Sequence, residues 1–253
     1  MSKLGVILPG EKMVIAARTG AGKSLMGLQI GHHSAAKGRK VLFITLEMSA
    51  IELTQRLMCS IGQVDNSSIR TRTTSSGERR RLIEAANELK DMPLYIMTPA
   101  SATISLICGA VRLQAKTTGV DLLIVDYLQR VGGSDPRASK REQLVEITNR
   151  LKDLAREIDA PLLELCQLNR ASEQSEEPKL SHLAESASIE NDADIVLFLH
   201  RVNDGTNAIV AKHRHDRIGK VKLTFNAVRT RFEELSVADD PRYTPAFNDF
   251  NNR

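Results

Sequence analysis

The chain has 253 residues, of which 42% are hydrophobic, 26% charged and 4% aromatic, and its formal net charge is +4. This composition is typical of a globular domain with a substantial core. The sequence contains no apolar stretch of about 18 residues and no apolar signal sequence. We therefore expect no membrane span and a cytoplasmic location. The small positive charge permits nucleic-acid binding, whereas the scarcity of aromatic residues argues against base stacking on aromatic platforms.

Short apolar runs alternate along the chain with amphipathic segments, which predicts strands that alternate with helices. In chain order, the expected strands cover 13–18, 41–46, 94–97, 122–127, 161–166, 195–200, 207–213, 220–225 and a short piece around Phe232. The expected helices run from the glycine-rich turn to about 37, and over 50–61, 77–90, 103–117 and 142–158. The helix over 142–158 has the clearest apolar stripe.

This alternation predicts the α/β class, with a mainly parallel sheet covered by helices on both faces. The last three strands have no helices between them, so we expect them to extend the sheet in antiparallel fashion. We expect one domain over residues 1–235 and a flexible polar tail over 236–253. The three cysteines lie among apolar neighbours without C-x-x-C spacing, which predicts free buried thiols.

The segment AARTGAGKS (16–24) lies between an expected strand and an expected helix and matches the phosphate-binding pattern G-x-x-x-x-G-K-[ST], except that Ala17 replaces the first glycine. In such a P-loop, backbone N–H groups surround the phosphates, the lysine reaches the β- and γ-phosphates and the hydroxyl binds Mg²⁺. The candidate nucleotide-binding residues are Arg18, Thr19, Gly20, Ala21, Gly22, Lys23 and Ser24. The alternative is that Gly-Lys-Ser only begins a helix.

Two acids follow apolar strands. Asp126 ends LLIVD and is a candidate for the Mg²⁺ shell together with Ser24, although apolar strands also end in Asp for capping reasons. Glu47 follows the strand over 41–46, which we expect next to the P-loop strand, so its carboxylate could accept a proton from the attacking water. The alternative for Glu47 is a place in the first turn of the next helix, where the helix dipole favours an acid.

These pieces together resemble the C-terminal motor domain of DnaB-type replicative helicases, which has a RecA-like P-loop fold. The resemblance covers roughly residues 8–234 and rests on five matching segments in order, with a sixth segment that continues the pattern. They are PGEKMVIAARTGAGKS (9–24), FITLEMS (43–49), LLIVDYLQ (122–129), LCQLNRASEQ (165–174), SHLAESASIENDADIVLFLHR (181–201) and KHRHDRIGKVKLTFN (212–226). The family commonly has Ala at the first P-loop position, so the resemblance implies that Ala17 is compatible with a working ATP site.

The resemblance also implies catalytic roles. Glu47 matches the glutamate that activates water, and Gln167 matches the glutamine that senses the γ-phosphate from the strand beside Asp126. Lys212 and Arg214 match basic residues that reach the ATP of the neighbouring subunit, where an arginine stabilises the transition state of phosphoryl transfer. The alternative for Lys212 and Arg214 is a pair of solvated charges on alternate strand positions.

The resemblance further implies single-stranded DNA in the central channel of a hexameric ring, contacted by loops over 130–143 and around 182–188. The candidate DNA-binding residues are Arg137, Lys140, Arg141, Ala184, Glu185 and Ser186. The second loop departs from the family pattern, since Ala184 stands where Arg is common and Ala187 where Gly is common. A solvated loop is the alternative for the three basic residues.

The family implies ATP and Mg²⁺ as cofactors, replication proteins as partners and 5′-to-3′ translocation. An N-terminal collar domain and linker helix have no counterpart in residues 1–8, so we expect an excised motor domain or a short form from a virus or mobile element. Two other functions stay open. One is a RecA-like strand-exchange or clock-type ATPase, and the other is a nucleotide-binding module that binds DNA or a partner with little turnover.

Overall fold

The computed structural model describes residues 7–99, 102–169, 171, 172, 175–183, 187–202, 205–226 and 228–234. Within these residues a nine-stranded sheet has the order β3-β2-β4-β5-β1-β6-β7-β8-β9. The strands are β1 (Lys12–Ala17), β2 (Val41–Thr45), β3 (Leu94–Met97), β4 (Leu122–Asp126), β5 (Leu162–Gln167), β6 (Ile195–Val202), β7 (Gly205–His213), β8 (Gly219–Asn226) and β9 (Arg231–Glu234).

The sheet has a parallel half and an antiparallel half. Strands β3, β2, β4, β5, β1 and β6 pair in parallel with one another, whereas β7, β8 and β9 each pair antiparallel with the preceding strand. The predicted α/β class and the antiparallel extension are therefore confirmed. All residues of β1, β2 and β4 are buried, as expected for parallel strands covered on both faces.

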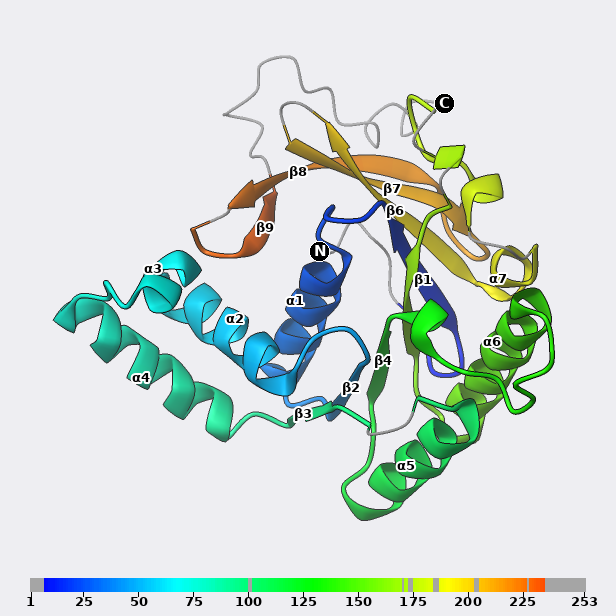
Figure 1. Cartoon of the computed structure of the whole chain (residues 1–253), viewed down its shortest axis with the longest axis horizontal. Helices are drawn as coiled ribbons and strands as arrows, with labels where there is room; N and C mark the ends of the chain where they lie inside the picture. Colours follow the sequence, from blue (N-terminus) through cyan, green and yellow to red (C-terminus); the bar gives the residue numbers. More distant parts are fainter. Residues whose placement is uncertain are drawn as a thin grey trace.

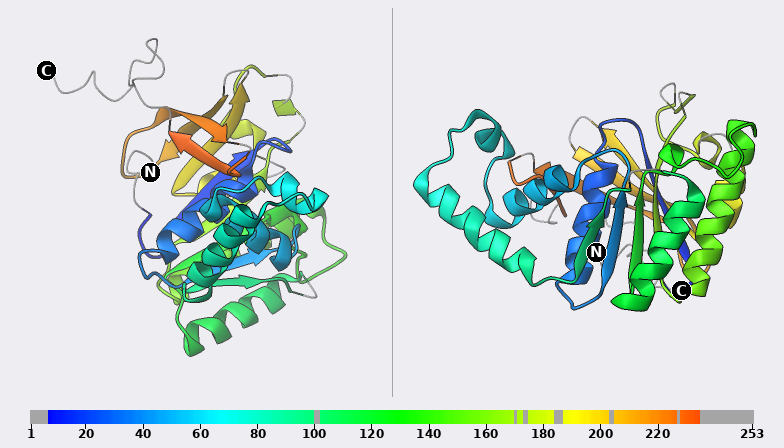
Figure 2. Two further views of the ribbon diagram at one scale, coloured as in Figure 1. Left: turned by 90° about the vertical axis from the view of Figure 1, so that its left-hand side faces the viewer. Right: turned by 60° about the horizontal axis from the view of Figure 1, so that its bottom comes forward.

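Helices cover both faces of the sheet (Figures 1 and 2). The helices are α1 (Lys23–Ala35), α2 (Ala50–Gly62), α3 (Asn66–Thr71), α4 (Ser76–Lys90), α5 (Ile104–Thr117), α6 (Lys140–Glu157) and α7 (Ala187–Asp192). Successive residues of a strand point to opposite faces, so Met13 and Ile15 pack in the core under α1, whereas Val14 and Ala16 pack in the core under α5 and α6. Outside this first layer, α2 packs on α1 and α4 packs on α2.

Two local features differ from the sequence-based expectations. Helix α3 is not among the expected helices, because NSSIRT has no apolar stripe; Asp65 begins it by accepting the Ser67 N–H. Helix α6 begins at Lys140 and not at 142, because Ser139 and Glu142 form a capping box. Lys140 and Arg141 therefore lie in the first turn of a helix, not in the expected loop. The predicted tail over 236–253 lies outside the described residues.

The three cysteines are buried thiols that form no disulfide among the described residues, as predicted. Among the described residues, none of the helices combines the length and apolar composition that crossing a membrane would require.

A buried ion pair joins β1 to β5 in the middle of the sheet. Lys12 and Glu164 are both fully buried, and Lys12 Nζ lies 3.2 Å from Glu164 Oε2 and also contacts the Thr148 hydroxyl. Burial raises the pKa of the Glu164 carboxyl, against the opposing charge of Lys12. The pair is costly to separate, because a single charge left in this position has no water to solvate it.

Lys12→Met is therefore expected to lower the free energy of unfolding by about 3–5 kcal/mol, because it leaves the Glu164 carboxyl buried without its partner. Urea denaturation of the whole chain measures the change. The double variant Lys12→Met/Glu164→Leu removes both charges and should recover most of the loss. Equal destabilisation in the single and double variants would show that the ion pair is not the cause.

Candidate active site

The turn between β1 and α1 has the backbone that phosphate binding requires. Gly20 and Gly22 have φ values of 76° and 94°, a left-handed conformation that glycine adopts without steric cost. Gly22 is also the N-cap of α1 and has no side chain to bond the first helical N–H groups. Those N–H groups and the positive end of the helix dipole are thus available to an anion.

The last strand, β9, closes one side of this turn. A Cβ atom added to Gly22 would lie 2.7 Å from Cζ of Phe232, so the ring leaves no room for a side chain there. Gln29 of α1 holds Phe232 in place: its Nε2 donates to the Phe232 carbonyl at 2.8 Å, and its Oε1 accepts the Phe232 N–H at 2.9 Å. The conformation of the turn therefore depends on a strand from the far end of the described chain.

Lys23, the first residue of α1, is paired with the candidate general base. Its Nζ lies 3.1 Å from Glu47 Oε2 and 4.3 Å from the ring centroid of Tyr127. The expectation that the strand before Glu47 adjoins the P-loop strand is wrong, because β4 and β5 separate β2 from β1. Glu47 reaches Lys23 all the same, because the carboxyl ends of parallel strands lie at one edge of the sheet.

Asp126 lies at the end of β4 and is fully buried, and neither carboxylate oxygen has a hydrogen-bond partner within the described residues. Burial raises the pKa of the Asp126 carboxyl; the Ser24 hydroxyl and the charge of Lys23 oppose the rise. Buried polar atoms are rarely left unpaired. Two unpaired carboxylate oxygens near a hydroxyl are the hard oxygen donors that Mg²⁺ prefers, so the residues present fit this ion.

Gln167 ends β5, between Asp126 and the P-loop, as expected. Its side chain Nε2 donates to Thr19 Oγ1 at 2.7 Å, which connects it directly to the P-loop. The side chain of Gln129 fixes the backbone of Gln167, since its Nε2 donates to the Gln167 carbonyl at 3.0 Å and its Oε1 accepts the Gln167 N–H at 3.3 Å. Arg18 differs from the other P-loop residues because its Nη2 donates to the carbonyls of Ser172 and Ser175.

Tyr127 and Arg130 belong to the site although the sequence analysis did not single them out. The Tyr127 ring lies beside the Lys23 ammonium, and Arg130 Nε donates to the Tyr127 hydroxyl at 3.2 Å. The only signal in the sequence is their place within four residues after Asp126, which does not distinguish a site residue from the start of a loop.

Lys212 and Arg214 lie at the opposite end of the sheet from the P-loop. Lys212 pairs with Val196, which is level with Val14 near the start of β1, whereas the P-loop leaves the end of β1. Lys212 Nζ donates to the Glu190 carbonyl at 2.6 Å, and burial together with the charge of Arg214 lowers the pKa of Lys212. The structure thus does not bring these two residues to the P-loop of their own chain.

The candidate DNA-binding residues are partly described. Arg137, Lys140 and Arg141 are exposed between η2 (Leu128–Arg130) and the first turn of α6, and within the described residues none of the three forms an ion pair. Exposed cations that form no ion pair with another described residue are available to phosphates. Ala184, Glu185 and Ser186 lie outside the described residues.

Comparison with known proteins identifies the fold and the family. Residues 3–234 match the model of the DnaB-like helicase C-terminal domain. The replicative DNA helicase DnaB of Geobacillus stearothermophilus is 34% identical over 248 residues, which cover 93% of this chain and 55% of the relative. A probable plasmid replicative DNA helicase of Chlamydia muridarum is 32% identical over 237 residues, covering 91% of this chain and 52% of the relative.

Two solved structures match with a TM-score of 0.85 and 29% identity. One is a DnaB-like replicative helicase described with its interactions with primase, and the match covers 91% of this chain and 58% of that one. The other is described as an ATPase domain, with 90% of this chain and 86% of that one covered. This chain spans about half the length of the curated relatives it matches. With a P-loop, a buried acid and a glutamine at consecutive strand ends, the chain belongs to the DnaB-like helicase C-terminal domain family.

Proposed function

We propose that this chain is the ATP-hydrolysing motor of a hexameric helicase, which translocates 5′ to 3′ on single-stranded DNA and unwinds duplex DNA during replication in the bacterial cytoplasm. The observation that supports it most is the meeting of Lys23, Glu47, Asp126 and Gln167 at the carboxyl ends of β1, β2, β4 and β5, which are four consecutive strands of the sheet. The likeness to replicative DNA helicases adds the DNA substrate, and the relative described with primase suggests a replication protein as partner.

The geometry suggests how the residues divide the work. The N–H groups of the P-loop would hold the β-phosphate, and Lys23 would leave Glu47 to contact the γ-phosphate. Glu47, freed from the ion pair, would accept a proton from the water that attacks the γ-phosphorus as the bond to the ADP oxygen breaks. Ser24 and Asp126 would hold Mg²⁺, which when bound offsets charge on the phosphates.

Gln167 would report the state of the γ-phosphate. Its amide lies against Thr19 of the P-loop, while Gln129 fixes its backbone from η2, which leads into the segment over 131–139. A shift of Gln167 on loss of the γ-phosphate would therefore reach the loop that bears Arg137. This connection gives ATP turnover a route to the candidate DNA contacts.

The test of the proposal is ATP hydrolysis by the whole chain at low salt, with and without single-stranded DNA, followed by an unwinding assay on a forked duplex. The expected result is turnover that single-stranded DNA stimulates, together with unwinding. ATP binding without turnover under either condition would favour the binding-module function. Turnover with filaments on DNA and no unwinding would favour a strand-exchange ATPase.

Lys23→Ala is expected to lower kcat for ATP hydrolysis by about 10²–10³-fold, because a charge-stabilising donor at the phosphates is lost. The fold should survive, since the partner Glu47 is 39% exposed and the lost pair contributes little to stability. Steady-state turnover and a thermal melt measure the two effects. Lys37→Ala, at an exposed lysine just after α1, is the matched control. Normal turnover in Lys23→Ala would place the ATP site elsewhere.

The triple variant Arg137→Ala/Lys140→Ala/Arg141→Ala is expected to weaken single-stranded DNA binding and to reduce the slope of log affinity against log salt by about 2, at about 0.7 per lost phosphate contact. Fluorescence anisotropy over a salt series measures the slope. Arg70→Ala/Arg79→Ala/Arg80→Ala removes three arginines from α3 and α4 and should leave the slope unchanged. Equal slopes for the first triple variant and the parent chain would remove these residues from the DNA site.

A further inference from the structure

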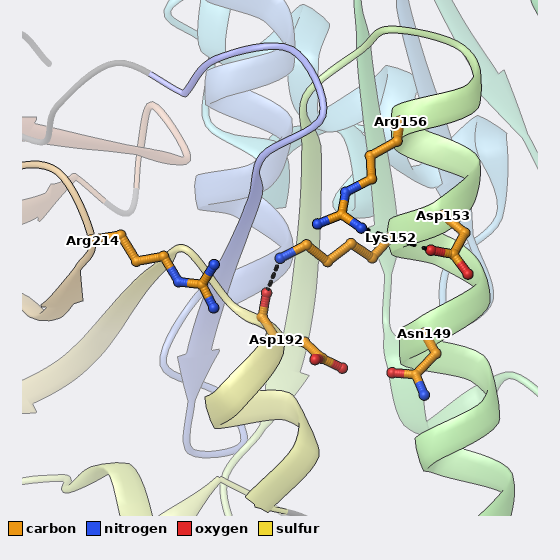
Figure 3. Close-up of a pocket in the computed structure, with 6 residues that line it drawn as sticks. All are labelled: Asn149, Lys152, Asp153, Arg156, Asp192 and Arg214. Carbon is orange, nitrogen blue, oxygen red and sulfur yellow. Dashed lines mark hydrogen bonds and ion pairs between the residues drawn. The ribbon is translucent and has the colours of Figure 1, made fainter.

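A cluster of charged side chains lies at the end of the sheet opposite the P-loop, where α6, α7 and β7 meet. A cavity of about 290 Å³ opens there and is lined by Asn149, Lys152, Asp153, Arg156, Asp192 and Arg214. In Figure 3, Arg214 and Lys152 approach each other from opposite sides of the cavity, Lys152 from α6 and Arg214 from the segment after β7. The proposed hydrolysis mechanism within one chain uses none of these residues.

Asp194, between α7 and β6, connects the parts of this cluster. Its Oδ1 lies 3.1 Å from Nη1 of Arg214, and its Oδ2 lies 3.1 Å from Nζ of Lys152 and accepts the Lys12 N–H at 2.9 Å. Its backbone also bonds to Lys12 and Arg214. Burial opposes charge here, but the Lys12 N–H and Lys152 hold the pKa of the Asp194 carboxyl below its ordinary value. Asp194 is therefore a charged, nearly buried and fully engaged anchor.

Arg214 is oriented by this anchor while much of it stays exposed. Its Nη1 pairs with Asp194 and its Nη2 donates to the Asn191 carbonyl at 3.0 Å, whereas 44% of the side chain is open to solvent. A guanidinium fixed on one edge can present its remaining N–H groups to an adjoining molecule at little entropic cost. One edge of the guanidinium is thus held by Asp194 and Asn191, and the side chain lines the cavity.

Lys152 extends the same network into α6. Its Nζ donates to the Asp192 carbonyl at 2.5 Å, and its pair with Asp194 is almost completely buried. Lys152 lies about 18 Å along the helix axis from Lys140, the first residue of α6, at about 1.5 Å per residue. A single helix thus joins the candidate DNA-binding residues Lys140 and Arg141 to the anchor of Arg214.

We infer that Asp194 is a positioning residue that orients Arg214 toward the ATP of the neighbouring subunit, and that Lys152 connects this anchor to α6. The inference rests on the proposed hexameric motor, in which the family resemblance implies that Arg214 acts across a subunit interface. Asp194 itself does not touch the nucleotide. Loss of Asp194 should therefore lower kcat, through the transition state that Arg214 stabilises, and should not weaken ATP binding.

Asp194→Asn keeps the size of the side chain and an oxygen that can accept the Lys12 N–H, but it removes the charge that fixes Arg214. With single-stranded DNA present, kcat for ATP hydrolysis should fall by about 10- to 100-fold while KM for ATP changes little, as expected when a catalytic group is misplaced by about 1 Å. Asp153→Asn is the matched control, because it neutralises an exposed acid of the same cavity whose ion pair, with Arg156, is long at 3.9 Å.

Mixing experiments separate positioning from a structural effect. Asp194→Asn chains retain their own P-loop residues and Glu47, and Glu47→Gln chains retain an oriented Arg214. Mixed rings should therefore contain interfaces at which one chain supplies the P-loop and Glu47 and the other supplies Arg214, and these interfaces should regain turnover. Arg214→Ala mixed with Glu47→Gln should regain turnover for the same reason. Asp194→Asn mixed with Arg214→Ala should not, because neither chain then presents an oriented arginine.

The outcomes distinguish the inference from the function on which it rests. Recovery with Arg214→Ala but not with Asp194→Asn would overturn the role of Asp194 and leave the shared ATP site intact. No recovery in either mixture with Glu47→Gln would overturn the shared site itself. If a thermal melt shows that Asp194→Asn does not fold, Lys152→Gln tests the same anchor. Lys152→Gln should lower kcat by a smaller factor than Asp194→Asn, leave KM for ATP unchanged and regain turnover when mixed with Glu47→Gln. A change in KM with no change in kcat would contradict the inference.

Discussion

Arg214→Ala is expected to lower kcat for ATP hydrolysis by about 10³–10⁵-fold, the loss that follows removal of an arginine supplied in trans to phosphoryl transfer. KM for ATP should change little, because the charge that Arg214 would offset develops only in the transition state. The fold should persist, since Asp194 keeps its contacts with Lys152 and the Lys12 N–H. Steady-state kinetics with single-stranded DNA and a thermal melt measure these effects.

The control for Arg214→Ala comes from the same cavity. Arg156→Ala removes a second arginine whose side chain is 61% exposed and whose ion pair in the described part of the chain is with Asp153. Its turnover should match that of the parent chain. Arg214→Lys should recover little activity, because an ammonium does not reproduce the two-sided contact of the guanidinium with Asp194 and Asn191. Parental kcat in Arg214→Ala would exclude a catalytic role for this arginine.

Glu47→Gln is expected to lower kcat by about 10²–10⁴-fold through loss of the general base. Affinity for a non-hydrolysable ATP analogue should rise by up to about fivefold, because Lys23 is no longer held by a competing carboxylate, and an exposed ion pair contributes at most about 1 kcal/mol. Single-turnover hydrolysis and analogue titration measure the two opposite changes.

Glu84→Gln, at an exposed acid on α4 paired with Arg80, is the matched control for Glu47→Gln and should change neither quantity. Weaker analogue binding in Glu47→Gln would show that the pair with Lys23 helps to hold the nucleotide. Undiminished turnover would show that another group activates the water.

Local sequence predicts the nine strands, the five longer helices and most of the candidate site, but not the short helices α3 and α7. The sequence signals for β1, β2, β4 and α6 are strong, because burial of these segments requires apolar residues at regular positions. The P-loop, Asp126 and Gln167 follow strand ends, and a parallel sheet brings strand ends to one edge, so their meeting could be expected before the strand order was known.

Other features depend on contacts that no local pattern encodes. The order of strands places β4 and β5 between β2 and β1, and nothing in the segment over 41–46 indicates this separation. Lys12 and Glu164 are charged residues in apolar runs, and each is buried only because the other is present. The connections made by Asp194 join α6, β1 and the end of β7, which periodicity within one element cannot relate.

The contact between Phe232 and Gly22 means that the residue at one of these distant positions limits which residues can stand at the other. The aromatic ring occupies the space that any side chain at Gly22 would need, and Gln29 is bonded to Phe232 across 203 positions of the chain. A side chain at Gly22 would meet the ring and would also be strained by the left-handed φ of 94°, and a cut before β9 would uncover one side of the P-loop. An engineer who shortens this protein should therefore treat β9 as part of the nucleotide site and not as a dispensable edge.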